Sequence, residues 1–202
     1  MLQWTTSQVY IGKVLMPARM LFIEVLAGTA DVSIAILRAG IEFVKSWDIK
    51  IDKRHDLLHE ENVKTLFKAL QDPCLLAVWF GTPCNTLSPA RRDDGGPPPL
   101  RSDSFPEGLP NLSEHDQQRV DEANQLATVT AMGMEIAFAN RAATVLENPC
   151  RSRLWRLKRI ITALARIGAI LIQLDYCSFG APWQKRTILA GTLKGLSKLA
   201  IL

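Results

Sequence analysis

Apolar residues along the chain fall into short runs that alternate with amphipathic stretches. Six runs of four to eight residues are rich in apolar side chains, as in strands that are covered on both faces. They cover residues 20–26, 42–49, 74–80, 143–146, 169–176 and 186–190. Between them, apolar positions recur at helical spacing over residues 31–39, 60–70, 113–140 and 152–167. Strands that alternate with helices predict parallel βαβ units, and therefore a single α/β domain over residues 1–202. We expect three layers around a mostly parallel sheet of six or seven strands.

One long segment interrupts this alternation. Residues 89–112 contain six of the eleven prolines, together with a pair of glycines and four consecutive charged residues. A loop of this length inside a compact domain is usually functional or disordered. Because it follows the strand predicted over 74–80 and its turn, we expect it to be a loop of the active site.

The net charge of +4 is unevenly distributed along the chain. Residues 151–202 carry ten lysines and arginines against the single acid Asp175, whereas residues 1–150 carry a net charge of −5. A basic C-terminal quarter is typical of a protein that binds a polyanion such as DNA or RNA. A charged face that only keeps the protein in solution explains the same pattern equally well.

Composition argues against a membrane protein and against a metal site. No apolar run reaches 18 residues without a charge, and residues 1–6 lack the pattern of a signal peptide. The four cysteines and three histidines do not have the spacing of a zinc site. We therefore expect no metal, no disulfide framework and an intracellular setting, in the cytoplasm or the nucleus.

Ligands of such sheets bind at the carboxyl ends of the strands, which draws attention to the turns there. Gly28 follows the first predicted strand, and Asp48 follows twenty residues later, a spacing typical of an acid that holds a ribose. An ordinary strand–turn–helix with a surface aspartate gives the same pattern. Asp31 stands where a phosphate would meet a negative charge, which favours a cofactor without a pyrophosphate.

Two further turns carry groups with chemical potential. Cys84 follows a buried strand directly, and with Arg91 and Arg92 nearby its thiol is a candidate nucleophile, although most free cysteines are structural. Glu147 ends another predicted strand at the same edge, as a proton donor, a hydrogen-bond partner or simply the acidic start of the next helix. Lys185 follows the aromatic Trp183 closely, a combination that suits a phosphate or a nucleobase.

In chain order, these motifs resemble those of the DNA cytosine-5 methyltransferases. Glu24-Val25-Leu26-Ala27-Gly28 is similar to the first motif of that family, Asp-Leu-Phe-Ala-Gly, and Asp48 and Asp56 fall at the acids of its next two motifs. Pro83-Cys84-Asn85-Thr86-Leu87-Ser88 is similar to the nucleophile motif Pro-Cys-Gln-x-x-Ser, and Glu147-Asn148-Pro149 to Glu-Asn-Val. Residues 179–191 are similar to Tyr-Gly-x-Pro-Gln-x-Arg-x-Arg. The resemblance covers about residues 20–191, and the Pro-Cys and Glu-Asn motifs are its specific part.

The resemblance implies an S-adenosylmethionine-dependent methyltransferase fold and methyl transfer to carbon 5 of cytosine. Cys84 would attack carbon 6 of the base, Glu147 would hold its ring nitrogen and amine, and Arg186 would orient the base. The target base would leave the duplex, and the 89–112 loop would close over it. The implied cofactor-binding residues are Glu24, Gly28, Asp48, Asp56 and Pro83. The implied nucleic-acid contacts are Ser88, Arg91, Arg92, Arg151 and Lys185.

The chain also departs from the family pattern. The Gly-x-Gly-Gly of the first motif is Gly28-Thr29-Ala30-Asp31, and Asn85 replaces the usual glutamine. No target-recognition domain is evident, so target choice would come from a partner chain or from the 89–112 loop. Two other functions fit part of the pattern: a catalytically silent methyltransferase-like module that binds nucleic acid or a partner protein, and a nicotinamide-dependent Rossmann enzyme. The latter leaves Cys84 and Glu147 unexplained.

Overall fold

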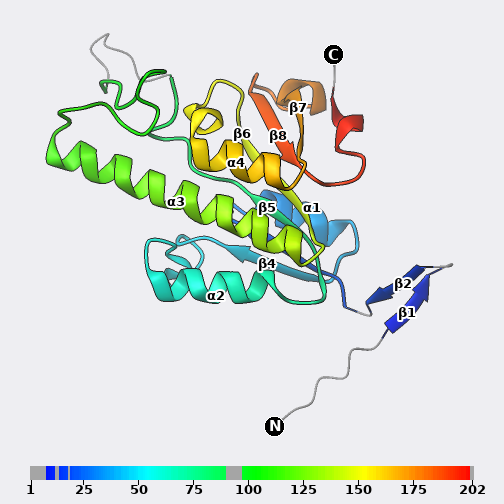
Figure 1. Ribbon diagram of the computed structural model, residues 1–202. Coiled ribbons are helices and arrows are strands. Elements are labelled where there is room, and N and C mark those ends of the chain that lie inside the picture. The colour runs from blue at the N-terminus through cyan, green and yellow to red at the C-terminus, as the bar shows by residue number, and fades with distance from the viewer. Residues whose placement is uncertain (1–7, 12–13, 18, 90–96, 201–202) are drawn as a thin grey trace.

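A six-stranded sheet forms the centre of the protein. The computed structural model describes residues 8–11, 14–17, 19–89 and 97–200 (Figure 1). The strand order is β4-β3-β5-β6-β8-β7. The strands are β3 (Leu21–Val25), β4 (Phe43–Trp47), β5 (Leu75–Phe80), β6 (Ala143–Pro149), β7 (Ile170–Asp175) and β8 (Arg186–Gly191). A separate antiparallel pair, β1 (Gln8–Ile11) and β2 (Val14–Pro17), precedes them and was not predicted.

The sheet is parallel except for one strand. Strands β4, β3, β5 and β6 pair in parallel, as expected for strands joined by crossover connections. Strand β8 runs antiparallel to both of its neighbours, β6 and β7. The reversal follows from the short connection through η3 (Tyr176–Phe179), which turns the chain back after β7. The prediction of an α/β fold with a mostly parallel sheet is confirmed, and the architecture is compatible with a Rossmann-like fold.

Helices cover the two faces of the sheet unequally. Three of them lie on one face: α2 (Glu60–Leu70), α3 (Glu114–Ala139) and α4 (Lys158–Arg166) (Figure 1). On the opposite face lies α1 (Asp31–Arg38), which contacts β3 and β4 (Figure 1). At the other end of the sheet, the short η4 (Leu196–Leu199) contacts β7, and its Leu196 packs in a second, smaller core. Partial cover of this kind leaves Leu76 of β5 41% exposed, so the expectation of strands buried on both faces was wrong for part of the sheet.

Two segments differ from the sequence prediction in ways that matter for function. Strand β6 continues past Leu146 to Pro149, because its last residues pair with β8, as in Glu147 with Leu189. The helix predicted over 152–167 is interrupted at Leu157, whose backbone is extended and whose side chain is fully buried. The single turn η2 (Arg153–Arg156), capped by Ser152, precedes the break, and α4 follows it.

A close approach between β8 and β6 fixes the middle of the sheet. A Cβ atom added at Gly191 would lie 1.9 Å from the carbonyl oxygen of Thr144 and 2.9 Å from the Cα atom of Val145. Both are backbone atoms that cannot rotate away. Glycine is therefore needed here for lack of space.

We expect Gly191→Ala to lower the free energy of unfolding by at least about 2 kcal/mol, because overpacking against backbone must separate the two strands. Urea unfolding followed by circular dichroism measures the loss. Lys194→Ala changes an exposed residue close by and is expected to have no such effect. A wild-type midpoint for Gly191→Ala would contradict the close approach.

Candidate functional site

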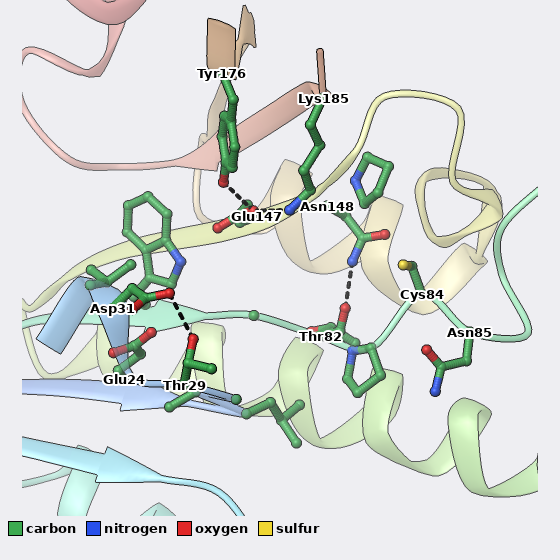
Figure 2. Close-up of a pocket in the computed structure, with 18 residues that line it drawn as sticks. Glu24, Thr29, Asp31, Thr82, Cys84, Asn85, Glu147, Asn148, Tyr176 and Lys185 are labelled. Atoms are coloured by element: carbon green, nitrogen blue, oxygen red, sulfur yellow. Dashed lines mark hydrogen bonds and ion pairs between the residues drawn. The ribbon is translucent and has the colours of Figure 1, made fainter. Parts of the chain in front are cut away.

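A cavity of about 420 Å³ opens at the carboxyl ends of β3, β5 and β6 (Figure 2). It lies where α/β sheets bind their ligands. Six predicted site residues line it, namely Glu24, Gly28, Pro83, Cys84, Glu147 and Lys185. Segments that are more than 150 residues apart in the chain therefore meet in one place.

The turn between β3 and α1 forms one wall of the cavity and has an unusual backbone. Leu26, Gly28 and Ala30 all have positive φ angles, of 58°, 57° and 59°. Only glycine adopts this region without cost, so the two other residues hold strain of about 1 kcal/mol each. Asp48 stabilises the turn, because its Oδ2 accepts a hydrogen bond of 2.8 Å from the Gly28 N–H. Ala30 thus keeps a left-handed conformation where the family motif has glycine.

Two carboxylates lie in this half of the cavity (Figure 2). Glu24 is 4% exposed, and its Oε2 accepts a hydrogen bond of 2.7 Å from the Ser33 N–H. Burial raises the pKa of Glu24, and the nearby Asp31 adds to that effect. Asp31 itself accepts a hydrogen bond of 2.7 Å from the Thr29 hydroxyl. A pair of acids suits a ligand that carries a positive charge and disfavours a phosphate.

The turn that carries Cys84 is held by two contacts from Thr82. The Thr82 hydroxyl lies 2.7 Å from that of Thr130 in α3, and the Thr82 carbonyl accepts a hydrogen bond of 2.6 Å from the Asn148 side chain. The carbonyl of Cys84 in turn accepts the Ser88 N–H at 2.8 Å, which closes the turn. The thiol is half-buried and lines the cavity, so a ligand can reach it.

A buried arginine fastens the far side of the same turn. Arg101 is 1% exposed, and both its Nε and its Nη2 donate to the Thr86 hydroxyl, at 3.2 and 3.0 Å. Its remaining hydrogen bonds to described residues go to the carbonyls of Pro106 and Val120 and to Oδ1 of Asn124. All of these acceptors are neutral, and burial lowers the pKa of Arg101 to about 10. The turn is therefore fixed at a considerable electrostatic cost.

Glu147 is the centre of a three-residue cluster. Its Oε1 accepts a hydrogen bond of 2.5 Å from the Tyr176 hydroxyl and one of 3.1 Å from Nζ of Lys185. The same Nζ lies 4.7 Å from the centre of the Tyr176 ring, a cation–π contact. Burial, and then the hydrogen bond to Glu147, raise the pKa of Tyr176, so its hydroxyl keeps its proton and remains a donor. Figure 2 shows the three side chains converging above the cavity.

A second cavity, of about 370 Å³, adjoins the first and is basic. It shares Pro149 and Lys185 with the first cavity and adds Ser88, Arg151 and Arg186. Arg186 lies 3.4 Å from Asp175 and is half-exposed. Lys185, which precedes Arg186, is thus the basic residue of this segment that reaches the cavity of Cys84 and Glu147.

The remaining predicted site residues lie elsewhere. Asp48 does not line the first cavity, and its two carboxylate oxygens accept the N–H groups of Gly28 and Lys50. Asp56 accepts the Leu58 N–H and also lies outside the cavity lining. The structure therefore gives both acids a role in shaping loops. Arg91 and Arg92 fall in residues 90–96, outside the described part of the chain.

Three important residues are not among the predicted site residues. Tyr176 directly follows Asp175, the last residue of β7. The rule that selected Glu147 would have selected Tyr176 too if the predicted strand had ended at Asp175. Asn148 lines the cavity and is 2% exposed, and its Oδ1 has no hydrogen-bond partner among the described residues. Nothing local in the sequence marks Arg101, because its partners come from distant segments.

Other kinds of site find no support in the described residues. No helix among them is both long enough and apolar enough to cross a membrane. Within the same residues, no three histidine, cysteine or acidic side chains are grouped as metal ligands would be. All four cysteines are free.

We expect Arg101→Met to lower the free energy of unfolding by about 2–4 kcal/mol, because it leaves buried acceptors without donors. Arg38→Met removes an exposed arginine and serves as the control. Urea unfolding gives the stability, and peptide-resolved alkylation gives the reactivity of Cys84, which we expect to rise as Thr86 is released. Unchanged stability and alkylation would contradict the role of Arg101.

Comparison of the chain with protein-family models finds no family that matches, and comparison with curated proteins finds no relative that matches. The cavity and the residues that line it are therefore the basis for a functional proposal.

Proposed function

We propose that the protein transfers a methyl group from S-adenosylmethionine to carbon 5 of cytosine in DNA. The observation that carries this proposal is the meeting of Cys84 and Glu147 in one cavity with the Gly28 turn. A nucleophile, a carboxylate that can hold a base and a glycine turn for a cofactor are the groups this reaction needs. The mostly parallel six-stranded sheet is compatible with the Rossmann-like fold that the resemblance implies.

The cofactor half of the cavity suits S-adenosylmethionine, which would supply an electrophilic methyl group. This cofactor carries an ammonium and a sulfonium charge and has no phosphate. Glu24 and Asp31 provide negative charge there, and the Gly28 turn lets a ligand approach the backbone. The same two acids disfavour a nicotinamide dinucleotide. Pro83 lines the cavity between this half and Cys84.

The other half of the cavity would hold the base. Cys84 attacks carbon 6, and the Glu147 oxygen left open by Tyr176 and Lys185 accepts a hydrogen bond from the exocyclic amine. The base must leave a duplex to reach this depth.

The second cavity would bind the phosphates on either side of that base. Arg151, Arg186 and Ser88 line this cavity, and Lys185 lines it with them. Residues 151–202 carry a net charge of +9, which favours a polyanion and does not separate DNA from RNA. Target choice would come from a partner chain, and a free catalytic thiol favours an intracellular setting.

The second candidate is a catalytically silent module that binds nucleic acid or a partner protein. The observation that favours it is Ala30, which stands where the family motif has glycine and holds a strained left-handed conformation. Such a module would bind DNA through its basic cavity without modifying it.

We expect the protein to bind S-adenosylmethionine with a dissociation constant of about 1 μM, or about −8 kcal/mol. Glu24→Gln is expected to weaken binding about tenfold, because it removes a charged partner of the ligand. Glu42→Gln removes an exposed acid instead and should bind like the wild type. Calorimetric titration measures all three, and a well-folded wild type that binds nothing would favour the silent module.

We expect Cys84→Ser to abolish methyl transfer to DNA while the protein remains folded, since a hydroxyl is a far weaker nucleophile than a thiolate. Transfer of radioactive methyl groups to DNA is the measurement. Cys74→Ser, at the opposite end of β5, is the control and should remain active. Full activity in Cys84→Ser would exclude the covalent mechanism.

A further inference from the structure

We propose that Lys185, and not Glu147, gives a proton to the ring nitrogen of the bound base. The inference rests on the proposed function and goes beyond it, because the motif resemblance assigns that nitrogen to Glu147. Its physical basis is the way in which the cluster of Glu147, Tyr176 and Lys185 uses its donors and acceptors.

Glu147 is arranged as an acceptor. The Tyr176 hydroxyl and the Lys185 ammonium both donate to its Oε1, so this oxygen has no room for a further donor. The second donor carries a positive charge, so its hydrogen bond to Oε1 is charge-assisted. Glu147 is 16% exposed on its side chain, so little water competes with these contacts. Within the described part of the chain, both of these hydrogen bonds go to Oε1, so Oε2 is the acceptor that suits the amine of cytosine.

Lys185 is arranged as a donor. Its Nζ carries three N–H groups, and the structure engages one with Glu147 and places the ammonium over the Tyr176 ring. The side chain is 42% exposed and lines the first cavity, so its other N–H groups can reach a ligand. Figure 2 shows it on the same side of the cavity as Glu147, with Cys84 farther along. A cytosine base that lies between Cys84 and this cluster meets the Glu147 acceptor and the Lys185 donor side by side. Its amine donates a hydrogen bond and its neighbouring ring nitrogen accepts one, so the base requires such a pair.

The step balances once the Cys84 thiol has given its proton to solvent. The Cys84 thiolate forms a bond to carbon 6, and the electron pair of the double bond between carbons 5 and 6 moves between carbons 4 and 5. The electron pair of the double bond between carbon 4 and the ring nitrogen moves onto that nitrogen, which takes a proton from Lys185. Lys185 is left as a neutral amine, and it recovers the proton when the thiolate leaves. Carbon 5 of the adduct is nucleophilic and can exchange its hydrogen with water.

Exchange of that hydrogen tests the inference without any cofactor. The probe is a DNA oligonucleotide whose cytosines carry tritium at carbon 5, and the readout is tritium released into water. We expect release by the wild type and none by Cys84→Ser. Lys185→Met should slow release at least about 100-fold, the usual contribution of a general acid. Lys68→Met removes an exposed lysine of α2, which does not line the cavity, and should release tritium at the wild-type rate.

Two conservative variants separate proton transfer from positioning. Lys185→Arg keeps the charge, but a guanidinium does not give up a proton, so release should fall as in Lys185→Met while DNA binding, followed by fluorescence anisotropy, stays close to that of the wild type. Glu147→Gln keeps a carbonyl that accepts from Tyr176 and Lys185, but its NH₂ group takes the place of Oε2 and loses the hydrogen bond to the cytosine amine. Its exchange should fall for that reason, and by less than the exchange of Lys185→Met.

The outcomes that overturn the inference differ from the one that overturns the proposed function. Near wild-type exchange by Lys185→Arg, with Glu147→Gln the more damaging change, would make Glu147 the proton donor and Lys185 its positioning residue. If the wild type releases no more tritium than Cys84→Ser, the proposed function fails and the inference fails with it. Thermal unfolding of each variant shows that a loss of exchange is not a loss of fold.

Discussion

The pairing of β8 between β6 and β7 is the interaction on which the candidate site depends. Strand β8 gives β6 a partner along its last residues, and this pairing carries β6 beyond Leu146 and holds Glu147 in a regular strand. The same strand begins next to Lys185, and the turn before it contains Tyr176. One reversed strand therefore brings together three side chains that are up to 38 residues apart. Gly191 allows the approach, because no other residue fits against the backbone of β6.

Much of the fold can be predicted from the sequence, because its signals are local. Helix α2 begins and ends where its periodicity indicates, and Ser113 caps α3 as its spacing to Asp116 indicates. The true end of β6 depends on pairing with β8, a strand that begins more than thirty residues later in the chain. The break before α4 coincides with Leu157, which is buried in the main core against distant segments. Neither signal is present in the neighbouring residues.

The candidate site, like the fold, can be predicted from the sequence only in part. The rule that ligands bind at the carboxyl ends of strands selects Gly28, Cys84 and Glu147, and all three line one cavity. It also selects Asp48, whose carboxylate instead holds the Gly28 turn from behind. Lys185 and Arg186 are adjacent basic residues, and the path of the chain into β8 decides which of them faces the cavity. That path turns Lys185 inward. Arg101 is the least predictable residue, since its partners lie in three separate segments.

In the strained turn after β3, the backbone conformation does not follow from the residue type alone. Ala30 adopts the left-handed dihedral angles that glycine adopts without cost. The angles of this turn are thus available to alanine as well as to glycine. Here the difference is one of conformational energy, about 1 kcal/mol, that the contacts of Asp48 with the turn help to offset. The turn at the start of α1 therefore stores energy in its backbone that a glycine at position 30 would release.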